Sequence, residues 1–211
     1  MPLIIASGSP RRRQLLACLG LTFRVVLPDV DEDAPSAANL RPEEMADALA
    51  GAKALSVAQR EGEGLVLAAD TLVVDGETIL GKPRDAAEAA AMLRRLRDRE
   101  HRVITGLALV DAARGDAGPA AHVTTAVRMR PYGDEEIAAY IARGEPFDKA
   151  GAYAIQDEAF HPVAAYQGCY CNVVGLPPRA VVRLLRQGGV DITDEHLAGL
   201  PAECGRCPIE V

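Results

Sequence analysis

Short apolar runs of strand length alternate with helix-like stretches in the first part of the chain. Residues 3–6 and 23–27 have the length of strands, and residues 65–69 form a continuous apolar run. Such a run is typical of a strand that is buried on both faces. Between the first two runs, Ser9 and Pro10 predict the start of a helix, because serine caps free N–H groups and proline fits the first turn.

Capping and turn signals predict the next elements. Pro42 with two following glutamates opens a helix that runs to about Arg60, since acidic residues favour a helix N-terminus. Asp75-Gly76 between two apolar runs predicts a hairpin. Asp85 caps a helix that ends near Arg97.

The second half of the chain continues the alternation. We expect further strands at 102–110, 123–128, 152–155 and 169–174, and helices at 134–143 and 178–187. Strands that alternate with helices, together with a hairpin and an antiparallel pair, indicate an α/β fold with a mixed sheet. No sequence repeat divides the chain, so we expect one domain over residues 1–190 and a tail over residues 191–211.

Composition and charge exclude several classes of protein. The 211 residues are 49% hydrophobic and 25% charged, which is an ordinary globular composition, and no apolar run approaches the ~18 residues of a membrane helix. The net charge of −7 and the eight aromatic residues argue against nucleic-acid and membrane-surface binding. The N-terminal apolar run is too short for a signal peptide, so we expect a cytoplasmic protein.

Five cysteines make an odd number in a chain of this class, and reduced thiols are the default expectation. Cys204 and Cys207 form a CxxC pair, and Cys169 and Cys171 form a CxC pair about thirty residues earlier. The four sulfurs could hold a structural zinc ion. A CxC pair is cramped for tetrahedral ligation, however, and Cys171 lies in a strand-like run, so free thiols or a disulfide in the tail are favoured over zinc.

Residues 7–13 form the first candidate site. A strand ends there, a loop of small residues turns, and a helix begins that carries three consecutive arginines. A helix N-terminus offers free N–H groups to an anion, and guanidinium groups bind phosphate in a bidentate manner. Consecutive arginines fan around a helix, so at least one of them points away from a shared ligand. The alternative is a capped surface helix with solvated arginines.

Asp70 is the second candidate, because it follows the buried run where α/β proteins form ligand clefts. Its carboxylate could activate water or bind a divalent metal ion, to which Asp31 and Glu32 in an acidic loop could contribute. A turn-forming aspartate is the alternative. Lys53 and Lys82 could each reach a phosphate, although single lysines are more often ordinary surface residues. The four histidines lack metal-binding spacing, and no catalytic role is assigned to them.

Eight ordered segments resemble the Maf family of nucleoside triphosphate pyrophosphatases, first described as septum-formation inhibitors. The resemblance extends over about residues 3–187. The segments that carry it are Ser7–Arg12, Val30–Glu32, Lys53–Ala54, Ala69–Thr71, Gly81–Pro83, His101–Gly106, Lys149–Gln156 and Val173–Pro177. The tail after about residue 190, with its CxxC pair, lies outside the family pattern.

The resemblance implies a fold related to the inosine-triphosphate pyrophosphatases, with two lobes and a long curved sheet around a cleft. It implies hydrolysis of a nucleoside triphosphate to the monophosphate and pyrophosphate with Mg²⁺ or Mn²⁺. The family often forms dimers, so a homodimer is also expected. A cation-rich site suits this reaction, because charge spreads over the pyrophosphate as it leaves.

The resemblance also assigns roles to individual residues. Asp70 matches the proton acceptor, and Glu32 matches an acidic position that would bind the metal ion together with Asp70. The residues that match triphosphate contacts are Ser7, Ser9, Arg12, Lys53 and Lys82. Arg11, Thr71 and Gln156 match three specificity positions and are similar to the branch that acts on dTTP and UTP.

One departure from the family pattern lies in Asp157-Glu158, where that branch usually has glycine and small residues. Two alternatives therefore stay open. One is the same reaction on another base, such as an inosine or 7-methylguanosine triphosphate. The other is a nucleotide-binding regulator of cell division that has no catalytic activity.

Overall fold

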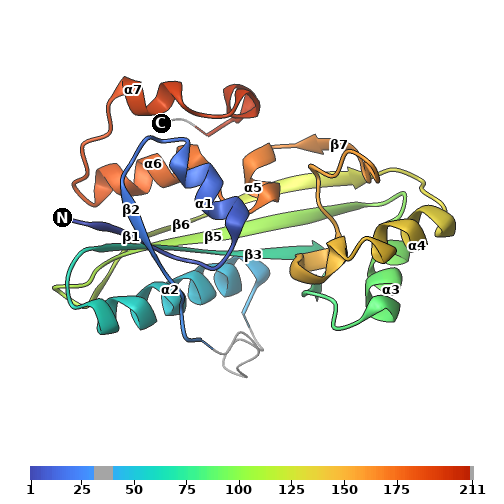
Figure 1. Ribbon diagram of the computed structural model, residues 1–211, viewed down its shortest axis with the longest axis horizontal. Coiled ribbons are helices and arrows are strands. Elements are labelled where there is room, and N and C mark those ends of the chain that lie inside the picture. The colour runs from blue at the N-terminus through green and yellow to red at the C-terminus, as the bar shows by residue number, and fades with distance from the viewer. Residues whose placement is uncertain (31–39, 210–211) are drawn as a thin grey trace.

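A single mixed sheet runs through the protein and carries helices on both faces (Figure 1). The structure is a computed structural model, and it describes residues 1–30 and 40–209. In the described residues the strands are β1 (Leu3–Ala6), β2 (Phe23–Val26), β3 (Leu65–Asp75), β4 (Thr78–Leu80), β5 (Glu100–Asp111), β6 (Asp116–Met129) and β7 (Val163–Gln167). Their order is β2-β1-β3-β5-β6-β7, and β4 pairs with β3. β1 runs parallel to β2 and β3, and the other pairs are antiparallel.

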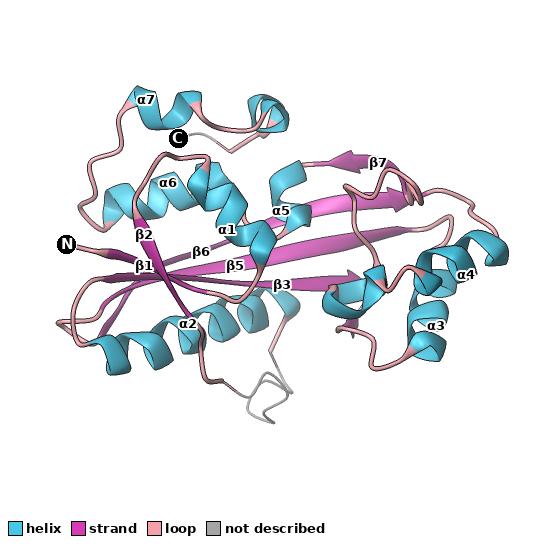
Figure 2. Cartoon of the chain, viewed as in Figure 1, coloured by secondary structure: helices cyan, strands magenta, loops and turns pink. Residues whose placement is uncertain are grey.

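The helices form two groups along this sheet, which agree with the two expected lobes (Figures 1 and 2). At one end α2 covers one face, and α1, α5 and α6 cover the other; at the opposite end α3 and α4 pack together. The helices are α1 (Pro10–Ala17), α2 (Pro42–Glu61), α3 (Ala86–Leu96), α4 (Asp134–Ala142), α5 (Tyr170–Val174), α6 (Pro178–Gln187) and α7 (Asp194–Ala198). The mixed α/β fold expected from the sequence is therefore confirmed.

The central strand β3 sends alternate side chains to the two faces of the sheet. Leu65, Leu67 and Ala69 lie in the core under α6, whereas Val66 and Ala68 lie in the core under α2. This period of two continues beyond the apolar run. Asp70 therefore points to the α2 face, and Thr71 points to the face that carries α1 and α5.

Helix α2 lies unusually close to the sheet. A Cβ atom added at Gly106 in β5 would lie 2.2 Å from the carbonyl oxygen of Ala46 in α2, so the glycine makes the contact possible. Further along the same face of the helix, Ala50 and Ala54 are fully buried. Small side chains on both elements allow this approach, and they bring Lys53 of α2 down to the level of β3.

The structure corrects two of the expected strands. Residues 150–152 form a short 3₁₀ helix, η3 (Ala150–Ala152), in which Gly151 and Ala152 have positive φ values that a strand does not accommodate. Residues 170–174 form α5, so Cys171 lies in a helix and not in a strand. The strand of this region is β7, which the sequence pattern missed and which pairs with β6. Gly168, with φ of +127°, separates β7 from α5.

The C-terminal residues fold back over α6 and α5 (Figure 2). They form α7 and a short 3₁₀ helix, η4 (Ala202–Arg206). Cys204 and Cys207 are buried in the same core cluster as the α6 residues, and Leu197 and Leu200 pack against it. The tail is therefore part of the packed structure. Within the described ranges, 1–30 and 40–209, no helix is both long and apolar enough to cross a bilayer.

Candidate active site

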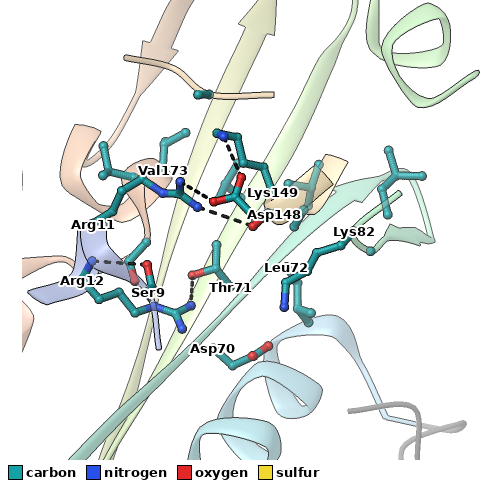
Figure 3. A pocket seen from close by; sticks show the side chains of 18 of the residues that line it. Ser9, Arg11, Arg12, Asp70, Thr71, Leu72, Lys82, Asp148, Lys149 and Val173 are labelled. Atoms are coloured by element: carbon teal, nitrogen blue, oxygen red, sulfur yellow. Dashed lines mark hydrogen bonds and ion pairs between the residues drawn. The ribbon is translucent and has the colours of Figure 1, made fainter. Parts of the chain in front are cut away.

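A cleft of about 1270 Å³ opens beside the middle of β3 (Figure 3). On this edge of β3, residues 65–68 pair with β1 and residues 73–75 pair with β4. The stretch between these two pairings lines the cleft with Asp70, Thr71 and Leu72. Asp70 thus lies in the middle of β3. The sequence pattern had indicated that it follows the end of a strand, so this expectation was wrong. The cleft forms at this point because β1 ends at Ala6, before β3 does.

One wall of the cleft is the start of α1. Ser9 is the N-cap, and its hydroxyl accepts a hydrogen bond from the backbone N–H of Arg12 at 3.4 Å. The backbone N–H of Ser9 in turn donates to Ser7 Oγ at 3.2 Å. Pro10 occupies the first turn, as expected. The two serines and the helix N-terminus form a polar rim that suits an anion.

Arg12 is fixed by contacts on both sides. Its Nε donates to the carbonyl oxygen of Gly175 at 2.8 Å, and one of its terminal nitrogens donates to Thr71 Oγ1 at 2.9 Å. Gly175 has φ of +123°, a value that favours glycine, and it follows α5 directly. The guanidinium is therefore held in one orientation at the cleft by a strand and a loop that are distant in sequence.

Lys53 and Asp70 form an ion pair on the floor of the cleft. Lys53 Nζ donates to Asp70 Oδ1 at 2.5 Å, and the two side chains are only 6% and 10% exposed. The pair joins α2 to β3 at the point where the small residues of α2 let the helix approach. Because burying a charge without a partner is costly, each of these groups requires the other.

A second, more open set of charges joins α1 to the opposite wall. Arg11 Nη1 donates to Asp148 Oδ2 at 3.0 Å, and Lys149 Nζ donates to Asp148 Oδ1 at 2.6 Å (Figure 3). Partial burial would raise the pKa of the Asp148 carboxyl, but the hydrogen bonds from Lys149 and Arg11 outweigh this effect and hold the pKa below its ordinary value. Gln156 and Lys82 also line the cleft.

Comparison with known proteins identifies the family of the chain. The family model described as Maf-like protein matches residues 2–188. The chain belongs to the Maf family.

Several curated relatives of this Maf chain are named dTTP/UTP pyrophosphatase. The relative from Thermomicrobium roseum is 53% identical and covers 99% of this chain and 94% of its own. The relative from Pelotomaculum thermopropionicum is 46% identical and covers 90% of this chain and 98% of its own. The relative from Symbiobacterium thermophilum is 50% identical and covers 90% of this chain and 95% of its own. Among solved structures, a HAM1 protein from Coxiella burnetii is 17% identical, with a TM-score of 0.46 over 63% of this chain and 74% of its own.

The cleft of the Maf chain brings together most of the residues singled out from the sequence. Its lining includes all the expected substrate contacts, namely Ser7, Ser9, Arg11, Arg12, Lys53, Thr71, Lys82 and Gln156, together with Asp70. Glu32 and Asp31 lie outside the described residues. Arg13 is exposed and does not line the cleft, so one of the three consecutive arginines points away from it, as expected.

Some lining residues were not assigned a role from the sequence. Asp148, Lys149 and Tyr153 line the wall opposite α1. Lys149 and Tyr153 belong to the segment Lys149–Gln156, one of those that resemble the Maf family. This resemblance could have singled them out from the sequence. Asp148 gave no such signal, because its contact with Arg11 joins positions 137 residues apart.

A buried histidine supports this wall of the Maf cleft. His101 of β5 is 3% exposed and its Nε2 lies 2.7 Å from the Tyr153 hydroxyl, so it is a buried, hydrogen-bonded residue of the sheet. Burial lowers the pKa of His101 from 6.5 to about 4 and raises that of Tyr153. The histidine is therefore neutral near pH 7, and it acts as a packing and hydrogen-bonding residue behind Tyr153.

The unusual Asp157 has a structural explanation. Its Oδ1 accepts hydrogen bonds from Arg143 at 2.7 Å and from the backbone N–H of Phe160 at 2.6 Å. Asp157 is not among the residues that line the cleft, whereas its neighbour Gln156 is. The departure from the family pattern thus stabilises the turn behind Gln156.

Oxygen donors suit a hard divalent cation, and Asp70 presents a carboxylate to the cleft (Figure 3). In the part of the chain that the structure describes, no three His, Cys, Asp or Glu side chains already form a metal site. The remaining expected ligand, Glu32, lies outside that part. Asp70 is thus the described residue that would contact a catalytic metal ion.

Proposed function

We propose that this protein hydrolyses dTTP and UTP to the monophosphate and pyrophosphate. The reaction class and the two substrates come from the names of relatives that match 90–99% of the chain. The observation that carries the proposal to this molecule is the cleft, where a buried carboxylate lies among arginine and lysine side chains beside a helix N-terminus. A triphosphate is the kind of ligand that such a concentration of cations favours, even though the whole chain is acidic.

The phosphate groups would lie between the start of α1 and the floor of the cleft. Ser7, Ser9 and the N–H groups at the α1 N-terminus would donate hydrogen bonds to phosphate oxygens. Arg12 is held in place by Gly175 and Thr71, so it would meet the ligand with little loss of side-chain freedom. Lys53 and Lys82 would offset the negative charge that grows on the leaving pyrophosphate.

Asp70 would accept the proton of the attacking water. A bond forms between the water oxygen and phosphorus, the anhydride bond between the α- and β-phosphates breaks, and pyrophosphate leaves with the electron pair of that bond. The carboxylate is suited to this role because it is a hydrogen-bond acceptor held against Lys53 at the cleft floor. A bound Mg²⁺ or Mn²⁺, contacted by Asp70 and Glu32, would make the water more acidic and neutralise phosphate charge.

The pyrimidine base would lie toward the opposite wall, near Arg11 and Gln156. The amide of Gln156 can both donate and accept hydrogen bonds, which fits a uracil or thymine edge. Thr71 would act indirectly here, since its hydroxyl accepts from Arg12 and lies 2.9 Å from Thr105 Oγ1. A cytoplasmic location, a homodimer and the absence of nucleic-acid and membrane partners stay predictions from the sequence.

The test is a pyrophosphate-release assay of the purified chain against the common ribo- and deoxynucleoside triphosphates, with Mg²⁺ and with Mn²⁺. We expect the fastest release from dTTP and UTP, and loss of that release in Asp70→Asn. Preference for another base would contradict the substrate assignment and keep the reaction. An Asp70→Asn variant that binds nucleotide and still turns over at the wild-type rate would contradict the assigned base.

A further inference from the structure

Four of the five cysteines meet beneath the C-terminal tail. They come from two segments about thirty residues apart, the N-terminal end of α5 and the region of η4, and they are Cys169, Cys171, Cys204 and Cys207. We call them the four-cysteine cluster. The Sγ atoms of Cys171 and Cys204 lie 3.0 Å apart, and all four residues belong to the same buried core cluster. Each of the four residues is at most 6% exposed.

A positive charge lies beside the cluster. Arg179 at the start of α6 donates to the carbonyl oxygen of Cys207 at 3.3 Å. The buried Nε of Arg179 has no hydrogen-bond partner among the described residues. Because four thiolates around a divalent ion carry a net charge of −2, a cation at this place would offset that charge.

We propose that the four-cysteine cluster binds one zinc ion as a structural site. Four thiolates make a closed tetrahedral set, which is the donor set of structural zinc and leaves no position for substrate. Cys171 lies in α5 and not in a strand, and its Sγ meets that of Cys204, so the CxC and CxxC pairs come together in one core cluster. This answers one of the two objections that the sequence raised against zinc, the strand-like run at Cys171.

Zinc binding requires a small adjustment of the cluster. A Zn–S distance of about 2.3 Å places the sulfurs of a tetrahedral site about 3.8 Å apart. Cys171 and Cys204 are closer than this, and the part of the chain described here contains no ready-made metal site. The sulfurs would therefore move apart by about 1 Å as the thiol protons leave.

The site would connect the tail to the wall of the catalytic cleft. Thr125 Oγ1 donates to the carbonyl oxygen of Cys169, and Asn172 donates to Thr125 Oγ1. α5 ends at Val174, and the carbonyl oxygen of the next residue, Gly175, accepts a hydrogen bond from Arg12. Zinc would thus fix the segment that orients Arg12 without contacting the substrate.

The test measures zinc in the full chain purified with a thiol reductant and without chelator, after washing with excess Mg²⁺. The wash removes metal from oxygen-ligand sites and leaves thiolate-bound zinc in place. We expect about one zinc per chain in the wild type and in the matched control Cys18→Ser, and less than about 0.1 in Cys204→Ser/Cys207→Ser. A strong chelator should lower the unfolding temperature of the wild type and leave that of the double variant unchanged.

A second measurement does not depend on folding of the double variant. After removal of zinc, the wild-type chain is titrated with Co²⁺, and thiolate-to-cobalt charge-transfer absorption should saturate at about one equivalent. Absence of both zinc and this absorption would overturn the proposal. So would a disulfide between Cys171 and Cys204 in metal-free protein, or equal zinc in wild type and double variant, which would indicate an adventitious ion only.

Discussion

The two ends of the cleft hold their charges in different ways. At the inner end, formed by Ser9, Arg12, Lys53 and Asp70, the Lys53 and Asp70 side chains are 6% and 10% exposed. At the outer end, formed by Arg11, Asp148, Lys149 and Gln156, the Arg11 and Asp148 side chains are 24% and 60% exposed. Both ends contain a cation–carboxylate pair, but only the inner pair is removed from water.

This difference leads us to expect different roles for the two ends, the reaction at the inner end and the selection of the base at the outer end. A buried pair is strongly destabilised when one partner is lost, because the other charge is left without compensation. An exposed pair contributes little to stability, because water and salt compete for both partners. We therefore expect changes at the inner end to affect turnover and folding strongly. Changes at the outer end should affect mainly the choice of base.

The largest effect is expected for Asp70→Asn. Loss of the general base should lower kcat on dTTP and UTP by about 100- to 10,000-fold, measured by steady-state pyrophosphate release. Asp148→Asn is the matched control, because it removes a carboxylate from the other end of the same cleft. Similar losses in the two variants would contradict the distinction between the ends.

Lys53→Met should destabilise the fold by about 3–5 kcal/mol, because it leaves the Asp70 charge buried beside an apolar side chain. Denaturant unfolding measures this loss. The double variant Lys53→Met/Asp70→Asn should recover part of it, since the uncompensated charge is gone. A single variant within about 1 kcal/mol of the wild type would show that the ion pair is not held as the structure has it.

His101 behind the outer wall should make stability depend on pH. Its pKa is lowered from 6.5 to about 4 by burial, so the unfolded chain binds more protons than the folded chain between these values. Its stabilising contribution is present above pH 6.5 and is lost as the pH falls to about 4, an expected change of about 3 kcal/mol.

The measurement for His101 is urea unfolding at several pH values between 7 and 4. The wild type should lose this stability on acidification, and His101→Gln should lose correspondingly less, because glutamine does not titrate. Parallel curves for the two proteins would mean that His101 is not the titrating group.

Gln156→Ala should change selectivity more than rate. Loss of one neutral hydrogen bond to the base should lower kcat/KM for UTP by about threefold to tenfold, with smaller changes on triphosphates that do not use that bond. A panel of kcat/KM values measures this. Equal losses on every base would contradict a selective role for Gln156.

The smallest effect is expected for the stability of Asp148→Asn. Its pair with Arg11 is exposed, so the free energy of unfolding should change by less than about 1 kcal/mol in denaturant titrations. A loss as large as that of Lys53→Met would mean that the outer end is as rigid as the inner end.

Local sequence signals predicted most elements of the fold. Ser9 and Asp85 cap α1 and α3 as expected, and the predicted hairpin joins β3 to β4, with Gly76 in its turn. These signals succeed because caps and tight turns depend on side chains within a few residues. The prediction failed at 152–155, which forms the end of a 3₁₀ helix followed by a loop, and at 169–174, most of which forms α5. Run length and apolarity do not distinguish a buried strand from a short buried helix.

For the site, the sequence by itself determined the chemical groups: the serines and arginines at the start of a helix, the carboxylate in a buried strand, and two lysines. The tertiary structure decided where they meet. β1 ends before β3 and leaves Asp70 at a cleft, Gly106 lets α2 bring Lys53 within 2.5 Å of it, and the four-cysteine cluster closes only when the tail packs on α5. The physical reason is that these contacts join residues far apart along the chain, so their geometry depends on packing of the whole sheet and its helices.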